Sequence, residues 1–209
     1  MTITTAVPID WKSRWRPTPA SMARLLVGLT IFGFGEGLLI ESHLGSTPWT
    51  VLSQGIAKKA DIGVDLATFF VGIGVLLCWY FVSERPGLGT VCNAIVIPVS
   101  LHFTLQGLPT PHHLWVRSLF MMGGVITIAF GCGLYISAHL GPGPRDGLMT
   151  GLHTRTRIPI AKVRLVLEAT VLVVGVIMGG VVGIGTVCFA VFVGPLVARF
   201  LTLFGWQTK

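Results

Sequence analysis

An arginine and an aspartate, Arg145 and Asp146, follow Pro144 in a long stretch of largely apolar sequence. Ionisable groups among apolar residues are costly to bury, so such a pair is a candidate functional site. Proline suits the first position of a helix, where free backbone N–H groups and the helix dipole attract an anion. The pattern predicts a substrate or proton site in which Arg145 pairs with an anionic group. The alternative is that Asp146 caps its own helix and Arg145 is a cytoplasmic topology anchor.

Two glutamates are further candidates for the same reason. Glu36 lies in the segment GFGEG, with no basic residue one helical turn away, so its carboxyl group must be neutral, exposed to water or paired across helices. Glu168 follows Arg164 by four residues, on the same face of a helix. That spacing predicts either a simple side-chain ion pair or, if Glu168 faces the interior, a proton relay.

The remaining candidates precede or begin two short segments. Pro48 and Trp49 open the first segment, as Pro144 and Arg145 open the second, and His43 and His139 stand at matching places before them. Two histidines suggest a metal, but no carboxylate or cysteine recurs beside them at ligand spacing. We therefore expect hydrogen-bonding histidines, no bound metal and no cofactor.

Enzyme motifs are missing from the sequence. It contains no HExxH and no GxSxG, and GLGT and GIGT lack the remaining glycine and the lysine of phosphate-binding loops. Glycine turns in which Thr90 or Thr186 caps the next helix explain these two segments. We expect a protein that is not an enzyme, and, without an ATP-binding motif, any transport to be passive or ion-coupled.

Composition shows what must position these residues. Of 209 residues, 52% are hydrophobic and only 11% are charged, and the mean hydropathy is +0.79. A water-soluble surface needs about twice that charge, so the expected environment is a lipid bilayer. Long apolar runs, each close to the length that crosses a bilayer, lie at about 24–44, 66–82, 91–107, 115–138, 163–181 and 186–204. The pieces 48–60 and 144–155 are too short to span and are predicted half-helices, re-entrant or interfacial.

The chain also repeats itself. Shifting the sequence by 96 residues aligns GFGEGLLIESHLG with AFGCGLYISAHLG, and GLGTVCNA with GIGTVCFA. Between Gly28 and Ala94, 21 of 67 positions are identical. We therefore predict an all-α membrane protein with about six transmembrane helices in two repeats, 24–107 and 115–204. Three spans in each repeat would give the two repeats opposite orientations, a layout found in many secondary transporters.

Charge predicts the orientation. With six spans, 12 of the 15 Lys and Arg residues fall on the side of both termini, and Lys58, Lys59 and Arg117 fall on the other. The positive-inside rule then places both termini in the cytoplasm. Residues 1–23 are expected to form a basic, proline-rich cytoplasmic arm before a single membrane domain, 24–209. Because the basic residues flank apolar runs and form no patch, we expect no nucleic-acid partner.

The signatures LGxxPWxVL and GPRDGLM, followed by PGLGT and VGIGT, give the chain a family resemblance. It resembles the YczE/YyaS-like bacterial membrane proteins, relatives of the YitT-type integral membrane proteins. The resemblance implies a multi-pass protein of the bacterial inner membrane, and supplies no substrate and no catalytic residues. In that family the first motif usually reads PWD, whereas Thr50 follows Trp49 here.

Two functions fit these features. The first is a small secondary transporter or channel for a small solute that uses the starts of both half-helices. An anion is one solute that fits this hypothesis. The second is an accessory or regulatory protein whose glycine-rich faces bind another membrane protein. A buried acid such as Glu36 favours the first, because a scaffold has no need of one. A homodimer that packs through these glycine faces is compatible with both.

Overall fold

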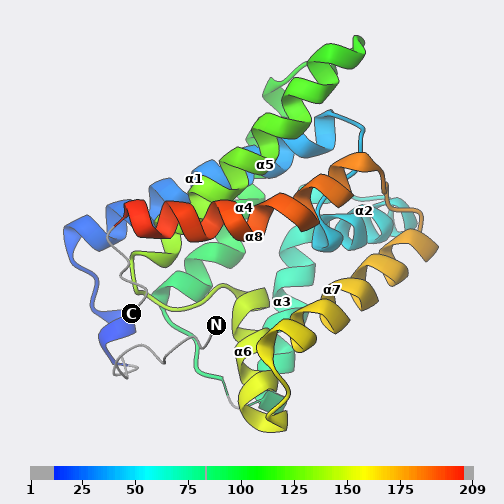
Figure 1. Cartoon of the computed structure of the whole chain (residues 1–209). Helices are drawn as coiled ribbons and strands as arrows, with labels where there is room; N and C mark the ends of the chain where they lie inside the picture. The colour runs from blue at the N-terminus through cyan, green and yellow to red at the C-terminus, as the bar shows by residue number, and fades with distance from the viewer. Residues whose placement is uncertain (1–11, 83, 205–209) are drawn as a thin grey trace.

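The computed structural model describes residues 12–82 and 84–204, and within these ranges the chain is helical, without strands (Figure 1). A single 3₁₀ turn, η1 (Ser13–Trp15), precedes the α-helices. These are α1 (Pro19–Glu41), α2 (Pro48–Ala60), α3 (Val64–Val82), α4 (Leu88–Gly107), α5 (Leu114–Ile136), α6 (Pro144–Thr156), α7 (Ile160–Ile177) and α8 (Ile184–Leu203). The prediction of a multispanning helical protein is confirmed.

Five helices are long and apolar enough to cross a membrane, namely α1, α3, α4, α5 and α8. Large apolar side chains such as Tyr80, Phe103 and Ile177 are exposed on the outside of the bundle, as expected of surfaces that face lipid. The remaining predicted span, 163–181, corresponds to α7, which differs because its 18 residues include Lys162, Arg164 and Glu168. Those charges keep it out of the group selected by length and hydropathy.

The two predicted half-helices are present. Helix α2 covers 48–60 as predicted, and α6 runs one residue beyond the predicted 144–155. Proline occupies the first turn of each, and each ends at a residue in the left-handed conformation, Asp61 or Arg157. Thirteen residues rise about 20 Å, which is less than the ~30 Å of bilayer hydrocarbon.

The first helix begins earlier than its apolar run. The Thr18 hydroxyl accepts a hydrogen bond from the backbone N–H of Ser21, the Ser21 hydroxyl accepts one from the backbone N–H of Thr18, and Pro19 follows the cap. These capping residues are polar, so hydropathy alone placed the start near residue 24. Part of the predicted cytoplasmic arm is therefore helical, and residues 1–11 lie outside the described residues.

Glycines let α1 and α5 cross closely at the centre of the molecule. A Cβ atom on Gly131 would lie 2.6 Å from both the carbonyl oxygen of Gly28 and the amide nitrogen of Phe32. Gly35 and Gly124 face each other in the same way. At a shift of 96 residues, Gly28 corresponds to Gly124 and Gly35 to Gly131, so the crossing joins equivalent parts of the two repeats.

The packing around this crossing is reciprocal. Helix α1 packs on α4 and α5 on α8, while α2 packs on α7 and α6 on α3. Each contact within the first of these pairs, and each contact between repeats in the second, thus has a counterpart made by the helices 96 residues away. Each repeat supplies its short helix to the third helix of the other repeat.

The turns before the short helices make the same exchange. The amide of Gly185 donates to the carbonyl of Leu44 at 2.7 Å, and the amide of Gly89 donates to that of Leu140 at 2.8 Å. The N-caps of α4 and α8 are Gly87 and Gly183, and the predicted threonines lie at the third helical position, where Thr90 and Thr186 each accept a hydrogen bond from the backbone N–H of that glycine. The two turns, with Gly45 and Gly141 both at φ of 113°, are thereby held where α2 and α6 begin.

Candidate functional site

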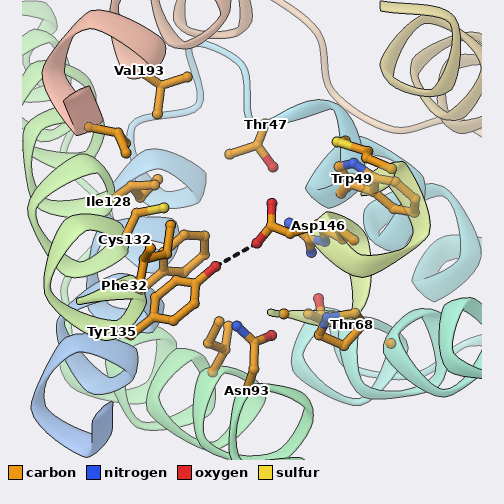
Figure 2. A pocket seen from close by; sticks show the side chains of 18 of the residues that line it. Phe32, Thr47, Trp49, Thr68, Asn93, Ile128, Cys132, Tyr135, Asp146 and Val193 are labelled. Carbon is orange, nitrogen blue, oxygen red and sulfur yellow. Dashed lines mark hydrogen bonds between the residues drawn. The ribbon is translucent and has the colours of Figure 1, made fainter. Parts of the chain in front are cut away.

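A cavity of about 210 Å³ lies where the two short helices begin. Thr47 and Trp49 line it from the start of α2, and Arg145 and Asp146 line it from the start of α6. Figure 2 shows Tyr135 and Cys132 of α5 on the opposite side of the cavity from Trp49. The cavity therefore lies at the junction of the two repeats.

Equivalent residues of the two repeats line this cavity together. The lining pairs, each separated by 96 positions, include Phe32 with Ile128, Trp49 with Arg145, Thr68 with Arg164, Gly72 with Glu168, and Ile97 with Val193. The pairs have similar shapes on the apolar side but different chemistry at the short helices. The charged members all come from the second repeat, so the site is symmetric in position and asymmetric in charge.

Arg145 reaches across the junction to the first repeat. Its Nη1 atom lies 3.4 Å from Oε1 of Glu36, and its guanidinium lies 5.4 Å from the centroid of the Trp49 ring. The Arg145 side chain is 24% exposed, whereas Glu36 is fully buried. The contact with Glu36 is longer than the 2.7–2.9 Å of a strong charge-assisted hydrogen bond, so it leaves the guanidinium with capacity for another partner.

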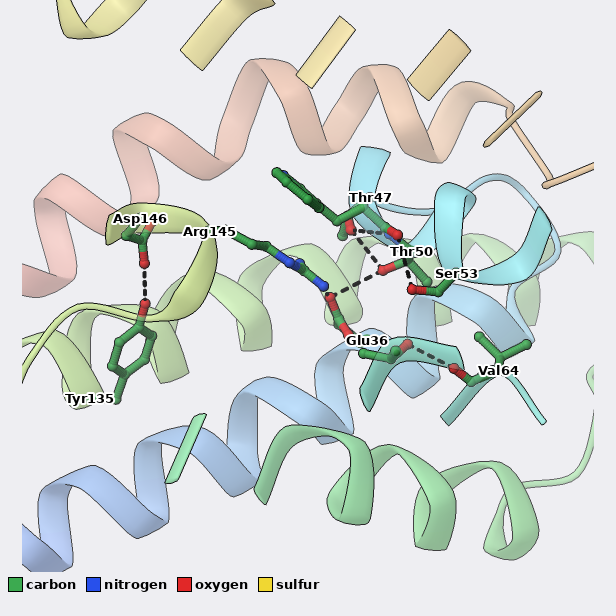
Figure 3. Close-up of polar contacts among 10 residues, drawn as sticks. Glu36, Thr47, Thr50, Ser53, Val64, Tyr135, Arg145 and Asp146 are labelled. Carbon is green, nitrogen blue, oxygen red and sulfur yellow. Dashed lines mark hydrogen bonds and ion pairs between the residues drawn. The ribbon is translucent and has the colours of Figure 1, made fainter. Parts of the chain in front are cut away.

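Glu36 is paired across helices, one of the three possibilities expected for it. Thr50 donates to Oε1 at 3.1 Å, and Thr50 is itself 2.7 Å from the hydroxyl of Thr47, the N-cap of α2 (Figure 3). The second carboxyl oxygen, Oε2, is buried without a hydrogen-bond partner among the described residues. The same is true of the indole nitrogen of Trp49. Buried polar atoms without partners cost about 1–3 kcal/mol each, so they are rare away from functional sites.

Asp146 turns in a different direction from Arg145. The hydroxyl of Tyr135 donates to Oδ2 of Asp146 at 2.6 Å, which ties α6 to α5 (Figure 3). The N-cap of α6 is Gly143, and Asp146 lies in the first turn of the helix. The indole of Trp79 donates to the carbonyl of Pro144 at 2.9 Å and fixes this end of α6 from the side of α3.

Glu168 has the expected partner and also borders the cavity. The Arg164 Nε atom lies 2.8 Å from Glu168 Oε1, the ion pair that the four-residue spacing predicted. Both residues line the cavity from α7. The pair is therefore local, yet it contributes charge to the site.

Other sequence candidates lie apart from the cavity. His43 and His139 are exposed and adopt left-handed conformations, with φ of 50° and 58°, in the turns after α1 and α5. Pro48 is buried in the first turn of α2 and does not line the cavity. No group of three or more His, Cys, Asp and Glu that could hold a metal occurs in the described part of the chain.

Sequence reasoning missed several polar residues of the site. These are Tyr135, Asn93, Thr68 and Thr47, all lining the cavity. Asn93 offered a signal, since it interrupts the apolar run 91–107 and corresponds to Phe189 in the second repeat. Tyr135 offered another, because it is one of only two tyrosines in the chain and also lies in an apolar run.

The sequence has clear relatives. Residues 20–202 match the model of a family described as "Family of unknown function (DUF6198)". An "Uncharacterized protein" of Haemophilus influenzae is 44% identical over 191 residues, which is 91% of this chain and 88% of the relative. The "Uncharacterized membrane protein YczE" of Bacillus subtilis is 33% identical over 177 residues, 83% of this chain and 81% of that protein.

A second Bacillus subtilis relative, the "Uncharacterized protein YyaS", is 24% identical over 181 residues, covering 85% of this chain and 90% of that one. No solved structure matches the chain. These relatives confirm the resemblance read from the two half-helix motifs, whereas the relation to YitT-type proteins stays a prediction. The chain is a multispan membrane protein that is related to YczE and YyaS, and it belongs to the DUF6198 family.

Proposed function

We propose that the protein is a small secondary transporter or channel that moves a small polar solute across the bacterial inner membrane through the cavity between its repeats. The observation that carries this proposal is that Arg145 and Asp146 line one cavity, while the fully buried Glu36 pairs with Arg145 from behind the cavity wall and keeps one carboxyl oxygen unpartnered among the described residues. Ionisable groups at membrane depth typically mark solute or ion pathways. A protein that only binds a partner through its outer faces has no use for them.

The proposed architecture has six spans, the five apolar helices and α7. A helix with Lys162 and Arg164 near its start and Glu168 at its middle can cross a bilayer if Lys162 lies toward the interface and Arg164 and Glu168 lie toward the cavity. Three spans in each repeat then give the repeats opposite orientations, with both termini in the cytoplasm. The reciprocal contacts of α2 with α7 and of α6 with α3 support this layout.

In this arrangement the starts of α2 and α6 form the solute site. Their free backbone N–H groups and dipoles give the cavity two regions of positive potential beside the charged side chains. Discontinuous or short helices that end at a central site are typical of secondary transporters with repeated folds. The chain contains no ATP-binding motif, so transport is passive or coupled to an ion gradient.

The test begins with the purified protein and a library of small metabolites and inorganic ions, each screened for a rise in melting temperature. A solute at 100 times its dissociation constant adds ~2.7 kcal/mol of stability. We expect wild type and Arg199→Ala to be stabilised by the same solute, because Arg199 is exposed and does not line the cavity. Arg145→Ala and Asp146→Asn should lose the effect.

The solute that stabilises wild type is then tested in proteoliposomes. Uptake that wild type supports and Arg145→Ala abolishes would support transport. If no compound stabilises wild type and no uptake occurs, the proposal fails, and co-purification from native membranes becomes the test of the accessory-protein alternative.

A further inference from the structure

Two opposite charges stand side by side at the start of α6 without pairing with each other. Arg145 extends to Glu36 on α1, and Asp146 extends to Tyr135 on α5. Figure 3 shows the two side chains diverging from adjacent positions. The cavity therefore has a cationic group and an anionic group at separate points of its wall, each with a single cross-helix polar partner.

The charges around the cavity disfavour a simple anion. Counted as ionised, the lining carboxylates of Asp146 and Glu168 balance the lining guanidiniums of Arg145 and Arg164. Glu36 does not line the cavity, but it is fully buried beside Arg145 and adds one negative charge. A solute with a net negative charge would raise this excess from one to two. Removing a charge from water without compensation costs several kcal/mol per ion, whereas a zwitterion leaves the balance unchanged.

Free hydrogen-bonding capacity matches both ends of a zwitterion. The guanidinium of Arg145 has five N–H donors and one long contact, at 3.4 Å, to Glu36. The indole N–H of Trp49, in a side chain only 6% exposed that lines the cavity, has no acceptor among the described residues. These donors suit a carboxylate. The Asp146 carboxylate, which receives the Tyr135 hydroxyl on Oδ2, can accept further donors and suits an ammonium group.

The remaining wall limits the body of the solute. Phe32, Ile128 and Val193 form an apolar side opposite the short helices (Figure 2). A volume of about 210 Å³ is enough for several water molecules and for a solute with a short aliphatic side chain.

We infer that the solute is a small aliphatic amino-acid-type zwitterion, with its carboxylate at Arg145 and Trp49 and its ammonium at Asp146; this inference rests on the proposed function. The carboxylate of the solute competes with Glu36 for Arg145. The site is then specific because it requires both charges of the solute at once. The carboxylate of the solute pairs with Arg145 and its ammonium group pairs with Asp146, two residues that do not pair with each other.

The experiment compares matched compounds that differ by one charged group. Binding to the purified full-length protein is measured for L-valine, isovalerate, which lacks the ammonium group, and isobutylamine, which lacks the carboxylate. Glycine with acetate and methylamine, and L-alanine with propionate and ethylamine, form two further sets. We expect an amino acid to bind at least ~30-fold more tightly than both of its single-charge analogues, as for loss of one partner of a buried charge pair.

Variants identify the group that recognises each charge. Asp146→Asn should weaken binding of the amino acid and bring its affinity close to that of the carboxylate analogue. Without the Asp146 carboxylate, the ammonium group of the amino acid no longer adds to its affinity. Arg145→Gln should likewise weaken binding of the amino acid and bring its affinity close to that of the amine analogue. Arg199→Ala is the matched control and should retain wild-type selectivity.

Three results would overturn the inference. Equal binding of isovalerate and valine would show an anion site, and equal binding of isobutylamine and valine would show a cation site. Absence of binding in all three sets would exclude small aliphatic amino acids as the solute. In each case a different solute that stabilises wild type and needs Arg145 would leave the proposed transport function standing, so the two failures can be told apart.

Discussion

The contact between Arg145 and Glu36 allows a quantitative test of the site. Replacing Arg145 by alanine leaves the fully buried carboxylate of Glu36 with Thr50 as its hydrogen-bond donor. Removing one partner of a buried ion pair typically costs 3–5 kcal/mol. Because the contact is 3.4 Å long and Arg145 is 24% exposed, we expect a smaller loss of about 2–3 kcal/mol in the free energy of unfolding.

A glutamine at position 36 should remove most of that cost. Its side-chain carbonyl can still accept from Thr50, and it brings no charge that needs Arg145. We therefore expect Arg145→Ala to cost less than about 1 kcal/mol in a Glu36→Gln background. The coupling energy, obtained from equilibrium unfolding of wild type, both single variants and the double variant in mixed micelles, is then about 2 kcal/mol.

A second cycle on Arg164 and Glu168 serves as the comparison. This pair is shorter, at 2.8 Å, but the Arg164 side chain is 48% exposed and the residues are one helical turn apart. Such pairs contribute about 0.3–0.5 kcal/mol. If distance decided the energy, this pair would couple more strongly. A coupling energy for Arg145 with Glu36 no larger than that for Arg164 with Glu168 would refute the view that burial strengthens the first pair.

Three further predictions concern the framework. Gly131→Ala should lower the melting temperature clearly, since its Cβ would lie 2.6 Å from the backbone of α1, whereas Gly123→Ala on the same helix, with open space around it, should be neutral or stabilising by up to ~1 kcal/mol. Trp79→Phe should cost about 1 kcal/mol through loss of the hydrogen bond to Pro144, and the same change at the exposed Trp115 should cost less in the same unfolding assay. A green fluorescent protein fused to the C-terminus should fluoresce and an alkaline phosphatase fused there should be inactive; the opposite pattern would contradict cytoplasmic termini.

The boundaries of the short helices were predictable because their signals are local. Pro48 and Pro144 each mark a first turn, and the repeat provides the same signal twice. The end of α6 was less predictable, since Arg157 takes the left-handed conformation without the glycine that usually marks it. The start of α1 was missed because Thr18 and Ser21 form the cap outside the apolar run.

The site was predictable only in part. Arg145 and Asp146 stood out because charge is rare in this sequence, and their position at a helix start followed from Pro144. Their partners did not follow, since Arg145 meets Glu36 across 109 positions and Asp146 meets Tyr135 across the turn that joins α5 to α6. The spacing of apolar residues along the chain does not predict such contacts between helices. The repeat identifies equivalent positions, but it does not predict which of them face each other.

The reciprocal contacts between repeats make each half of the chain depend on the other. Each turn that precedes a short helix is held by the other repeat, through Leu44 with Gly185 and Leu140 with Gly89. A polypeptide of one repeat's length would contain only one partner of each of these hydrogen bonds, so it would lack the support that fixes the start of its short helix. The pair of repeats, and not the single repeat, is therefore the unit that these contacts stabilise.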